Sequence, residues 1–408
     1  MRYFKLQISL MALIGFGFIH LFLNLYPSLF LLVTRNQKAD SRNSYPNVSA
    51  APLPHVQRFI SLLNISSAFK NFIPVKDSFW NRNQHRMFQI LDTLHLHGAT
   101  MYTPPLECNL TELEAEIPDL HSYSWQHRDF VRYMHCRDLP QNIDHRDKCS
   151  GGVFLLLAIK SMVTNFERRQ AIRETWGKEM TVEGIRVRTV FLLGSASNLG
   201  QGPDLQKLLN FEDQLFGDIL QWEFKDTLFN LTLKDYLFLK WATAHCPLVQ
   251  YVFKGDDDIF LNIPVLLRYL QSLDKDLCKK LYVGHTISQA TPLRDIKSKY
   301  SIPKSFYDGA YPVYAGGAGF LYSGNLVQLL YTVAHFILFF PIDDVFTGMC
   351  FSALGISPLS HPGFHTFDIN AAQRDNPCSH LNLILVHQRT PLQTIQLWKA
   401  LHSPELRC

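Results

Sequence analysis

The sequence predicts an α/β domain with a largely parallel central sheet, preceded by a transmembrane helix and a stem. Two observations support this. Short apolar runs of strand length alternate with amphipathic segments from residue 154 onward, which is typical of α/β domains. A long apolar run lies at the N-terminus. With 408 residues and 47% hydrophobic content, the chain can bury one large core or two ordinary ones.

The N-terminal residues 6–33 are mostly apolar and long enough to span a bilayer as a helix. Arg2 and Lys5 precede them in a tail, residues 1–5, that has no acidic residue, which favours a cytosolic N-terminus. A cleaved signal peptide shares the basic start, but its apolar run is usually shorter. We therefore expect a type II signal anchor with the rest of the chain in the lumen.

Glycosylation sequons and cysteines agree with a lumenal domain. Four sequons follow the apolar run, at Asn47, Asn64, Asn109 and Asn230. The eight cysteines are an even number and lack the paired Cys-x-x-Cys spacing of zinc sites, so we expect disulfides. Proximity in the sequence favours pairing Cys136 with Cys149.

The composition along the chain suggests three segments after the anchor. Residues 34–105 are rich in Asn, Ser and Pro without a sustained period, as expected for a stem, although Trp80 and Phe88 could pack onto the domain that follows. Residues 106–150 form a cysteine-bearing lead-in, and residues 151–408 the catalytic domain. The net charge of +4 is spread over interspersed charges and gives no nucleic-acid footprint.

The elements of the catalytic domain are expected in alternating order. They are a strand at 154–159, a helix at 167–176, strands at 188–193 and 218–224, a helix at 231–244 and a buried strand at 251–253. Ligands bind beyond the carboxyl ends of strands in such sheets. The last of these strands runs directly into an acidic cluster.

That cluster, Asp256, Asp257 and Asp258, would resist burial unless a cation compensated its charge. Hard oxygen ligands suit Mn²⁺ or Mg²⁺, which usually complete their shells with water and nucleotide phosphates. Alternation along an extended chain points Asp256 and Asp258 to one side. A solvated acidic turn or a helix cap is the alternative.

A second carboxylate pair, Asp343 and Asp344, begins an amphipathic stretch. Capping of a helix N-terminus is the ordinary role of such residues, and it is an alternative for one of the two. The other suits a general base, because a partly desolvated carboxylate accepts a proton readily and a base must lie apart from metal-binding carboxylates.

A glycine-rich segment contains Gly316, Gly317 and Gly319, and it follows Tyr311 and Tyr314. Its spacing is not the dinucleotide fingerprint, so a Rossmann nucleotide site is rejected. Glycines in a strand can mark a bulge or close packing. The tyrosines could stack on a substrate, which suggests a substrate wall.

Among seventeen histidines, His387 ends an apolar run and is a candidate for an imidazole ligand to the metal. His361 is its competitor.

Five blocks in this sequence together resemble the Golgi β-1,3-glycosyltransferases, and among them the β-1,3-N-acetylglucosaminyltransferases of poly-N-acetyllactosamine type. The resemblance runs from about Phe154 to Cys408. The blocks are Arg168–Gly177, Val190–Gly194, Phe253–Phe260, Tyr314–Phe320 and Pro341–Gly348.

The resemblance implies a GT-A type fold, a UDP-sugar donor, Mn²⁺ with Mg²⁺ as an alternative, and inversion to give a β-1,3 bond. It makes Asp258 the principal metal ligand, with Asp256 and His387 beside it, and favours Asp344 over Asp343 as the base. The residues it places near the donor are Arg168, Arg169, Arg173, Lys254 and Asp257.

The resemblance favours UDP-GlcNAc as donor and a terminal galactose of an N-acetyllactosamine-type glycan, on a glycoprotein or glycolipid, as acceptor. It also implies a Golgi membrane location and allows homo- or hetero-oligomers. Transfer of galactose from UDP-galactose is the first alternative, and a non-catalytic glycan-binding protein the second. Ala318, where the family pattern has glycine, and the additional Cys278 depart from the pattern.

Overall fold

The computed structural model describes residues 63–97, 115–182, 184–195 and 204–408. The described residues belong to one compact unit, Leu53–Cys408. The predicted signal anchor and the sequons at Asn47 and Asn109 lie outside them. Of the helices that the structure describes, none combines the length and apolarity needed to cross a membrane.

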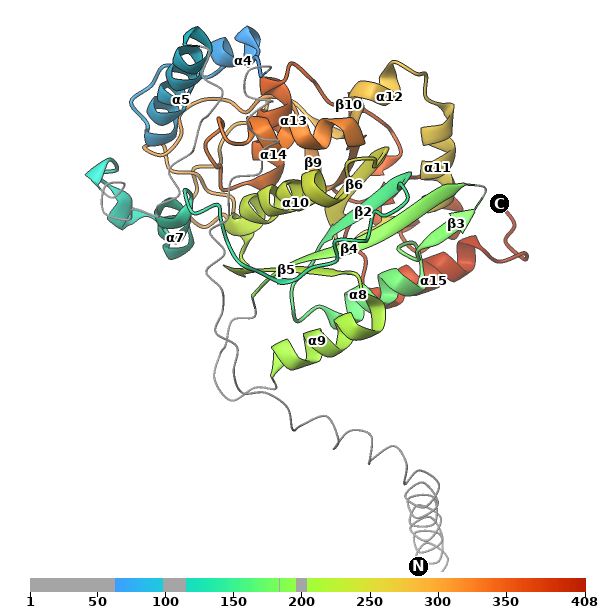
Figure 1. The fold of residues 1–408 in the computed structure, drawn as a ribbon. Coiled ribbons are helices and arrows are strands. Elements are labelled where there is room, and N and C mark those ends of the chain that lie inside the picture. The colour runs from blue at the N-terminus through green and yellow to red at the C-terminus, as the bar shows by residue number, and fades with distance from the viewer. Residues whose placement is uncertain (1–62, 98–114, 183, 196–203) are drawn as a thin grey trace, which may run out of the picture. The chain divides into compact units, whose positions relative to one another are not determined.

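A nine-stranded sheet forms the centre of the domain (Figure 1), with the order β1-β5-β4-β2-β6-β9-β8-β10 and with β3 paired to β4. Its strands are β1 Gln141–Ile143, β2 Leu155–Lys160, β3 Met180–Val182, β4 Ile185–Ser195, β5 Ile219–Lys225, β6 Tyr251–Asp256, β8 Tyr282–Ile287, β9 Tyr314–Ser323 and β10 Leu359–Ser360.

The sheet is mixed, which corrects the prediction of a largely parallel one. Strands β5, β4, β2 and β6 are parallel, as the alternation of apolar and amphipathic segments indicated. Strand β9, however, is antiparallel to both of its neighbours, β6 and β8. Apolar runs alone do not reveal strand direction, and the long connection before β9 contains no helix pattern to suggest a parallel crossover.

The core lies on both faces of this sheet. Along β2, Leu155, Leu157 and Ile159 belong to one apolar cluster and Leu156 and Ala158 to the other, because successive side chains point to opposite faces. A strand buried on both faces reads as a continuous apolar run, which is why its position was predictable.

Helices cover both faces of the sheet (Figure 1). One face carries α8 Phe166–Glu174, α9 Leu205–Phe216, α11 Ile263–Ser272 and α15 Pro391–Leu401; the other carries α10 Leu231–His245, α13 Val327–Val333 and α14 Asp343–Ala353. The short helix α12, Leu277–Lys280, precedes β8. The helices predicted at 167–176 and 231–244 correspond to α8 and α10.

In the described part of the chain before β1, the structure has the α-helices α4 Ser67–Phe72, α5 Phe79–Leu96 and α7 Trp125–Tyr133. The first two fall within the segment where no regular structure was expected. Trp80 of α5 is fully buried and donates a hydrogen bond from its indole N–H to the carbonyl of Leu338, 3.2 Å away. Buried apolar residues in α5 show that its stability comes from packing on the domain.

A small sheet brings the C-terminal segment to the end of β6. Its order is β11-β12-β7, with β7 Phe260–Leu261, β11 Phe364–His365 and β12 Leu385–Val386. Strand β12 is antiparallel to β7, and the N–H of Arg389 donates to the carbonyl of Asp258 at 2.7 Å. The chain around His387 is therefore fixed beside the acidic turn.

The disulfides differ from the predicted pairing. Cys149 pairs with Cys246, not with Cys136, and Cys378 pairs with Cys408. Cys136 is also disulfide-bonded, whereas Cys278 and Cys350 are free. Cys149 and Cys246 precede β2 and β6. The parallel register of these strands aligns Leu155 with Tyr251, so the two cysteines meet where both strands begin.

Candidate metal and carboxylate site

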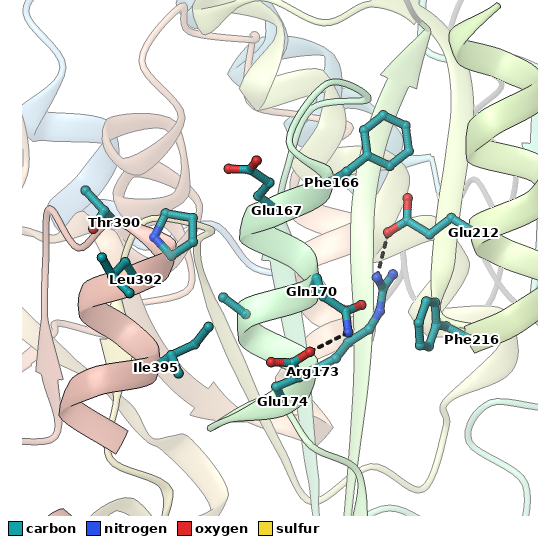
Figure 2. Close-up of a pocket in the computed structure, with 12 residues that line it drawn as sticks. Phe166, Glu167, Gln170, Arg173, Glu174, Glu212, Phe216, Thr390, Leu392 and Ile395 are labelled. Carbon is teal, nitrogen blue, oxygen red and sulfur yellow. Dashed lines mark hydrogen bonds and ion pairs between the residues drawn. The ribbon is translucent and has the colours of Figure 1, made fainter. Parts of the chain in front are cut away.

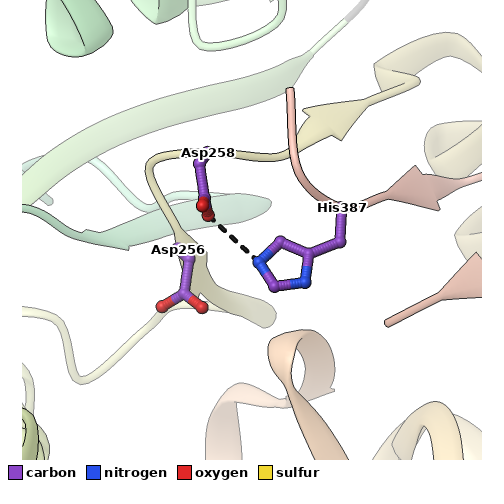
Figure 3. Close-up of side chains that lie close together, drawn as sticks. All are labelled: Asp256, Asp258 and His387. Atoms are coloured by element: carbon purple, nitrogen blue, oxygen red, sulfur yellow. Dashed lines mark hydrogen bonds and ion pairs between the residues drawn. The ribbon is translucent and has the colours of Figure 1, made fainter. Parts of the chain in front are cut away.

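An acidic turn follows the carboxyl end of β6 and approaches the C-terminal segment (Figure 3). Ligand atoms from Asp256, Asp258 and His387 all lie within 4.8 Å of one another. All three side chains are partly exposed, at 30%, 32% and 21%. Two carboxylate oxygens and one imidazole nitrogen form a donor set that suits a divalent first-row ion, and solvent can reach it.

A hydrogen bond to the backbone carbonyl of Thr366 orients His387 for this role. Its Nδ1–H donates to the carbonyl of Thr366 at 2.8 Å, while Nε2 lies 3.1 Å from Asp258 Oδ1. Because the carbonyl holds the Nδ1–H, Nε2 is the ring nitrogen that faces Asp258 and that would ligate a metal ion there. Although burial opposes charge on both groups, their mutual hydrogen bond raises the pKa of His387 and lowers that of Asp258. His361 lies elsewhere, packed on Tyr269 with ring centroids 4.7 Å apart.

Arg168 is the predicted donor-side arginine that the structure brings to this cluster. Its Nη1 lies 3.6 Å from Asp257 Oδ1 and 3.6 Å from Asp258 Oδ2, and it is buried without a hydrogen-bond partner among the described residues. Asp257 accepts hydrogen bonds from Ser161 Oγ at 2.6 Å and Asn165 Nδ2 at 2.8 Å. Burial raises the pKa of Asp257, and these bonds oppose that effect. The carboxylate of Asp257 is therefore already hydrogen-bonded by protein groups, unlike a carboxylate left open for a metal ion.

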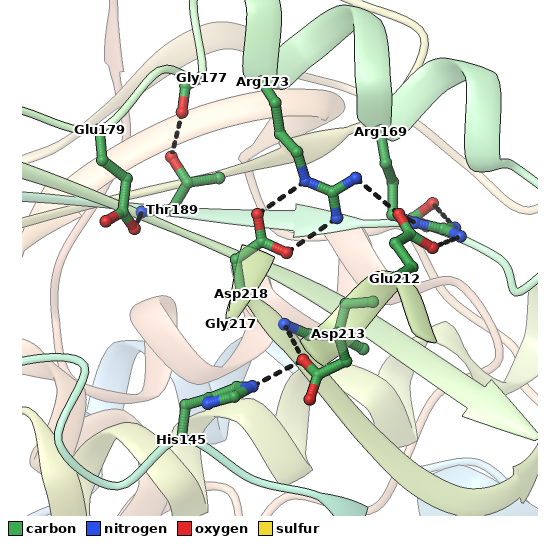
Figure 4. Close-up of polar contacts among 12 residues, drawn as sticks. His145, Arg169, Arg173, Gly177, Glu179, Thr189, Glu212, Asp213, Gly217 and Asp218 are labelled. Atoms are coloured by element: carbon green, nitrogen blue, oxygen red, sulfur yellow. Dashed lines mark hydrogen bonds and ion pairs between the residues drawn. The ribbon is translucent and has the colours of Figure 1, made fainter. Parts of the chain in front are cut away.

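Arg169 and Arg173 bind buried partners within the protein (Figure 4), and their predicted place near the donor stays a prediction. Arg169 is fully buried and binds Glu212 through Nε at 2.8 Å and Nη2 at 2.6 Å. Arg173 binds both oxygens of Asp218 at 2.8 Å and also Glu212 at 2.6 Å. These forked pairs join α8 to α9 and to the start of β5. Arg169 also donates to Ser161 Oγ at 3.2 Å, and the Ser161 hydroxyl in turn bonds Asp257.

Lys254 also binds a partner within the protein. Its side chain is 4% exposed and forms an ion pair with Asp235 of α10, with Asp343 at 3.9 Å. Residue 254 lies inside β6, where alternation directs it into the core beneath α10. Its donor-binding role stays a prediction, and its charge is already paired with Asp235.

A lysine that the sequence analysis missed lies between the two carboxylate groups. Lys160 ends β2, and its Nζ lies 2.9 Å from Asp256 Oδ1 and 2.7 Å from Asp343 Oδ2. The signal in the sequence was a lone lysine ending an apolar strand. Two carboxylates hold the pKa of Lys160 well above its usual value against the effect of burial.

The aspartates that begin α14 have different environments. Asp343 is buried, and although burial alone would raise its pKa, the neighbouring Lys160 and Lys254 lower it. Asp344 is half-buried and accepts hydrogen bonds from the N–H groups of Gly317 at 2.9 Å and Val345 at 2.8 Å. Burial, reinforced by the charge of Asp343, raises the pKa of Asp344 to about 7. Asp344 has the properties of a base near neutral pH.

The glycines of β9 allow close approach of neighbouring elements. A Cβ at Gly316 would lie 2.7 Å from Thr366 and one at Gly319 2.5 Å from Leu385, and both would overlap these side chains. At Gly317 the nearest atom would be Asp344 Oδ2, 3.1 Å away. Gly317 therefore faces the candidate base, and Gly316 and Gly319 serve packing against the small sheet.

Tyr311 and Tyr314 are packed in the core. Their side chains are only 6% and 8% exposed, and the Tyr311 ring contacts Tyr307 and Phe340 at centroid distances of 5.9 and 5.6 Å. Burial raises the pKa of both tyrosines. Their ring faces are covered by protein, which differs from the stacking surface expected from the sequence.

A separate groove of about 630 Å³ lies between α8 and α15, with the end of α9 along its side (Figure 2). Glu167, Gln170 and Glu174 line it from α8, opposite Leu392 and Ile395 of α15. Arg168 is not among its lining residues, because the helix period places it on another side of α8. The groove is therefore distinct from the metal and carboxylate site.

Two of the predicted sequons lie in the described part of the chain. Asn64 is exposed. Asn230 precedes α10 and donates a hydrogen bond to the carbonyl of Lys225 at 2.8 Å, while Thr232 of the same sequon is buried and bonded to the carbonyl of Phe340 at 2.6 Å.

The structure thus combines an α/β domain, a cluster of Asp256, Asp258 and His387 that could hold a metal ion, and a separate carboxylate, Asp344. Residues 167–362 match the family described as galactosyltransferase. The chain is 44% identical to "N-acetyllactosaminide beta-1,3-N-acetylglucosaminyltransferase 2" of Mus musculus over 81% of this chain and 86% of that protein. It is also 44% identical to "UDP-GlcNAc:betaGal beta-1,3-N-acetylglucosaminyltransferase 7" of Rattus norvegicus, over 68% and 71%.

These relatives show that the chain belongs to the galactosyltransferase family, within its β-1,3-N-acetylglucosaminyltransferase group. The family predicted from the five sequence blocks is confirmed. A similar solved structure, the "WbbM bifunctional glycosytransferase apo structure", has a TM-score of 0.34 and 11% identity over 79% of this chain and 64% of that chain, so the assignment rests on the sequence relatives.

Proposed function

We propose that the protein transfers N-acetylglucosamine from UDP-GlcNAc, in β-1,3 linkage and with inversion, to galactose of an N-acetyllactosamine-type glycan on a glycoprotein or glycolipid. The observation that carries this proposal is the pairing of an Asp256–Asp258–His387 ligand set with Asp344, a separate carboxylate whose pKa is raised to about 7. The names of these relatives supply the donor, the acceptor and the linkage.

Asp256, Asp258 and His387 would hold the metal ion, for which we propose Mn²⁺, with Mg²⁺ as the alternative. Such an ion neutralises charge that develops on the donor diphosphate as the sugar leaves. Arg168 supports this site because its side chain is partly exposed, and its guanidinium lies beside the acidic turn, where it can pair with a phosphate oxygen.

Asp344 would act as the general base. Its carboxylate takes the proton of the acceptor hydroxyl as that oxygen attacks the anomeric carbon from the side opposite the leaving diphosphate. The N–H of Gly317 and the start of α14 hold the carboxylate in place. Asp343 is a poorer base because its ion pair with Lys160 stabilises the carboxylate and lowers its pKa, so it holds a proton less readily.

The GT-A assignment and the membrane topology are part of the same proposal. The apolar residues 6–33 and the sequons after them support a type II protein of the Golgi membrane with a lumenal catalytic domain. Protease protection of the domain in intact membrane vesicles, lost on adding detergent, would test this orientation.

The function is tested by incubating the full-length protein in detergent with an N-acetyllactosamine acceptor, Mn²⁺ and either UDP-GlcNAc or UDP-galactose. Product masses distinguish the two donors. A gain of one N-acetylhexosamine is expected, whereas a gain of one hexose would make the protein a galactosyltransferase. No product with either donor, from protein that binds the glycan, would favour a non-catalytic glycan-binding role.

A further inference from the structure

Lys160 makes three polar contacts that join different parts of the site. Its ammonium lies 2.9 Å from Asp256 Oδ1, 2.7 Å from Asp343 Oδ2 and 3.3 Å from the carbonyl oxygen of Gly317. An ammonium has three N–H donors, so these contacts account for all of them. The partners come from β6, α14 and β9.

The register of the sheet places the lysine at this junction. Lys160 and Asp256 are aligned partners at the ends of the parallel strands β2 and β6. The lysine side chain is only 4% exposed. Burying an ammonium is unfavourable unless opposite charge and hydrogen bonds compensate it, and here two carboxylates and a carbonyl do so. Its geometry is therefore fixed by strong local interactions.

Gly317 extends the connection to the candidate base. Its carbonyl accepts from Lys160, and its own N–H donates to Asp344 Oδ2 at 2.9 Å. A continuous path of hydrogen bonds thus leads from a predicted metal ligand, through Lys160 and Gly317, to Asp344.

We propose that Lys160 is a positioning residue that couples the metal-binding turn to the base: its ammonium competes with the metal ion for Asp256, and it holds Gly317, and through Gly317 the base Asp344, in place beside that turn. This inference rests on the proposed function and extends it to a lysine whose side chain is only 4% exposed. Loss of the ammonium displaces Asp344 relative to the metal and leaves two carboxylates without their shared cation.

Two measurable effects of opposite sign follow for Lys160→Met. Turnover falls, because misplacing a reacting group by about 1 Å costs on the order of 100-fold in rate. Mn²⁺ binding does not weaken and becomes several-fold tighter, because a positive charge 2.9 Å from a ligand oxygen has been removed. A residue needed only for folding would instead lower both quantities together.

The experiment compares wild type with Lys160→Met by Mn²⁺ titration, followed by electron paramagnetic resonance of the free ion, and by kcat with UDP-GlcNAc. Lys148→Met is the matched control. Lys148 is 9% exposed and also binds a carboxylate, Glu179 at 2.7 Å, and a carbonyl, Gly217 at 2.8 Å, away from the site. It should change thermal stability without changing Mn²⁺ affinity or kcat.

A second variant keeps the test valid if Lys160→Met folds poorly. In Lys160→Met combined with Asp343→Asn, one buried negative charge is removed together with the positive one, so folding is less perturbed. Its kcat should stay near that of Lys160→Met and well below that of Asp343→Asn alone. Recovery to the level of Asp343→Asn would show that Lys160 only balances Asp343 and would overturn the proposal.

The two proposals fail in different ways. If wild-type protein makes no product from UDP-GlcNAc, the proposed function is wrong, while Mn²⁺ titration still reports on Lys160 because it needs no turnover. Weaker Mn²⁺ binding in folded Lys160→Met, or an unchanged kcat, overturns the role of Lys160 and leaves the function in place.

Discussion

The carboxylate of Asp344 accepts a hydrogen bond from the backbone N–H of Gly317, with 2.9 Å between nitrogen and oxygen. The contact joins the first turn of α14 to β9, so the candidate base is located by the central sheet. A side chain at residue 317 would begin 3.1 Å from the same oxygen. The glycine therefore supplies both the donor and the space that this carboxylate needs.

Replacing Asp344 with Asn should lower kcat by about 10²- to 10⁴-fold, because the amide cannot accept the proton of the acceptor hydroxyl. Donor binding, measured by calorimetry with UDP and Mn²⁺, should be unchanged. Asp343→Asn is the comparison, and its turnover should fall less. Turnover that survives in Asp344→Asn but is lost in Asp343→Asn would reverse the two roles.

The rate should rise with pH through about 7. Burial and the Asp343 charge raise the pKa of Asp344 to about 7, and the base works only when it is deprotonated. At pH 6 about a tenth of the carboxyl is ionised, and below that kcat/KM should fall about tenfold per pH unit. Asp343→Asn removes the neighbouring charge, so the acid limb of its profile should move to lower pH. An acid limb near pH 4 in wild type would contradict the assignment.

His387→Ala should weaken Mn²⁺ binding by at least about 10-fold, since it removes the one imidazole of the ligand set. The measurement is a titration of the protein with Mn²⁺. His361→Ala serves as the control, because that ring packs on Tyr269 and contributes no ligand atom. Equal losses in both variants would mean that His387 supports the fold without binding the metal.

The arginines of α8 should separate by function. Arg173→Ala breaks buried pairs with Asp218 and Glu212 and should lower the free energy of unfolding by about 3–5 kcal/mol. Arg168→Ala should keep the stability, because its side chain is 34% exposed, but should raise KM for the UDP-sugar. Denaturant unfolding and initial rates measure the two effects. A stable Arg173→Ala with a raised KM would return that residue to the donor site.

Sequence patterns located the elements better than the directions of their strands. The buried strand before Asp256 is visible as an apolar run, and a candidate metal site follows because acidic residues at its carboxyl end must meet solvent or a cation. His387 was found as a polar residue ending a similar run. Strand β9 carried no such sign of its direction, so the mixed character of the sheet came only from the structure.

Contacts between distant segments explain the remaining differences. A motif places Arg168, Arg169 and Arg173 together, but only the helix period and the position of Glu212 decide which side each one faces. Lys160 became significant only once β2 was known to lie beside β6. These two strands are far apart in the chain, so no local sequence pattern shows that they are neighbours in the sheet.

The Cys149–Cys246 disulfide joins the segments that enter β2 and β6, and the opposite ends of these strands carry Lys160 and Asp256. Recombinant production in a reducing cytosol would therefore yield a thiol form in which the two strands have no covalent link at their start. Preparations intended for kinetics or crystallisation should come from a host with an oxidising secretory route, and a thiol count should precede any conclusion drawn from an inactive sample.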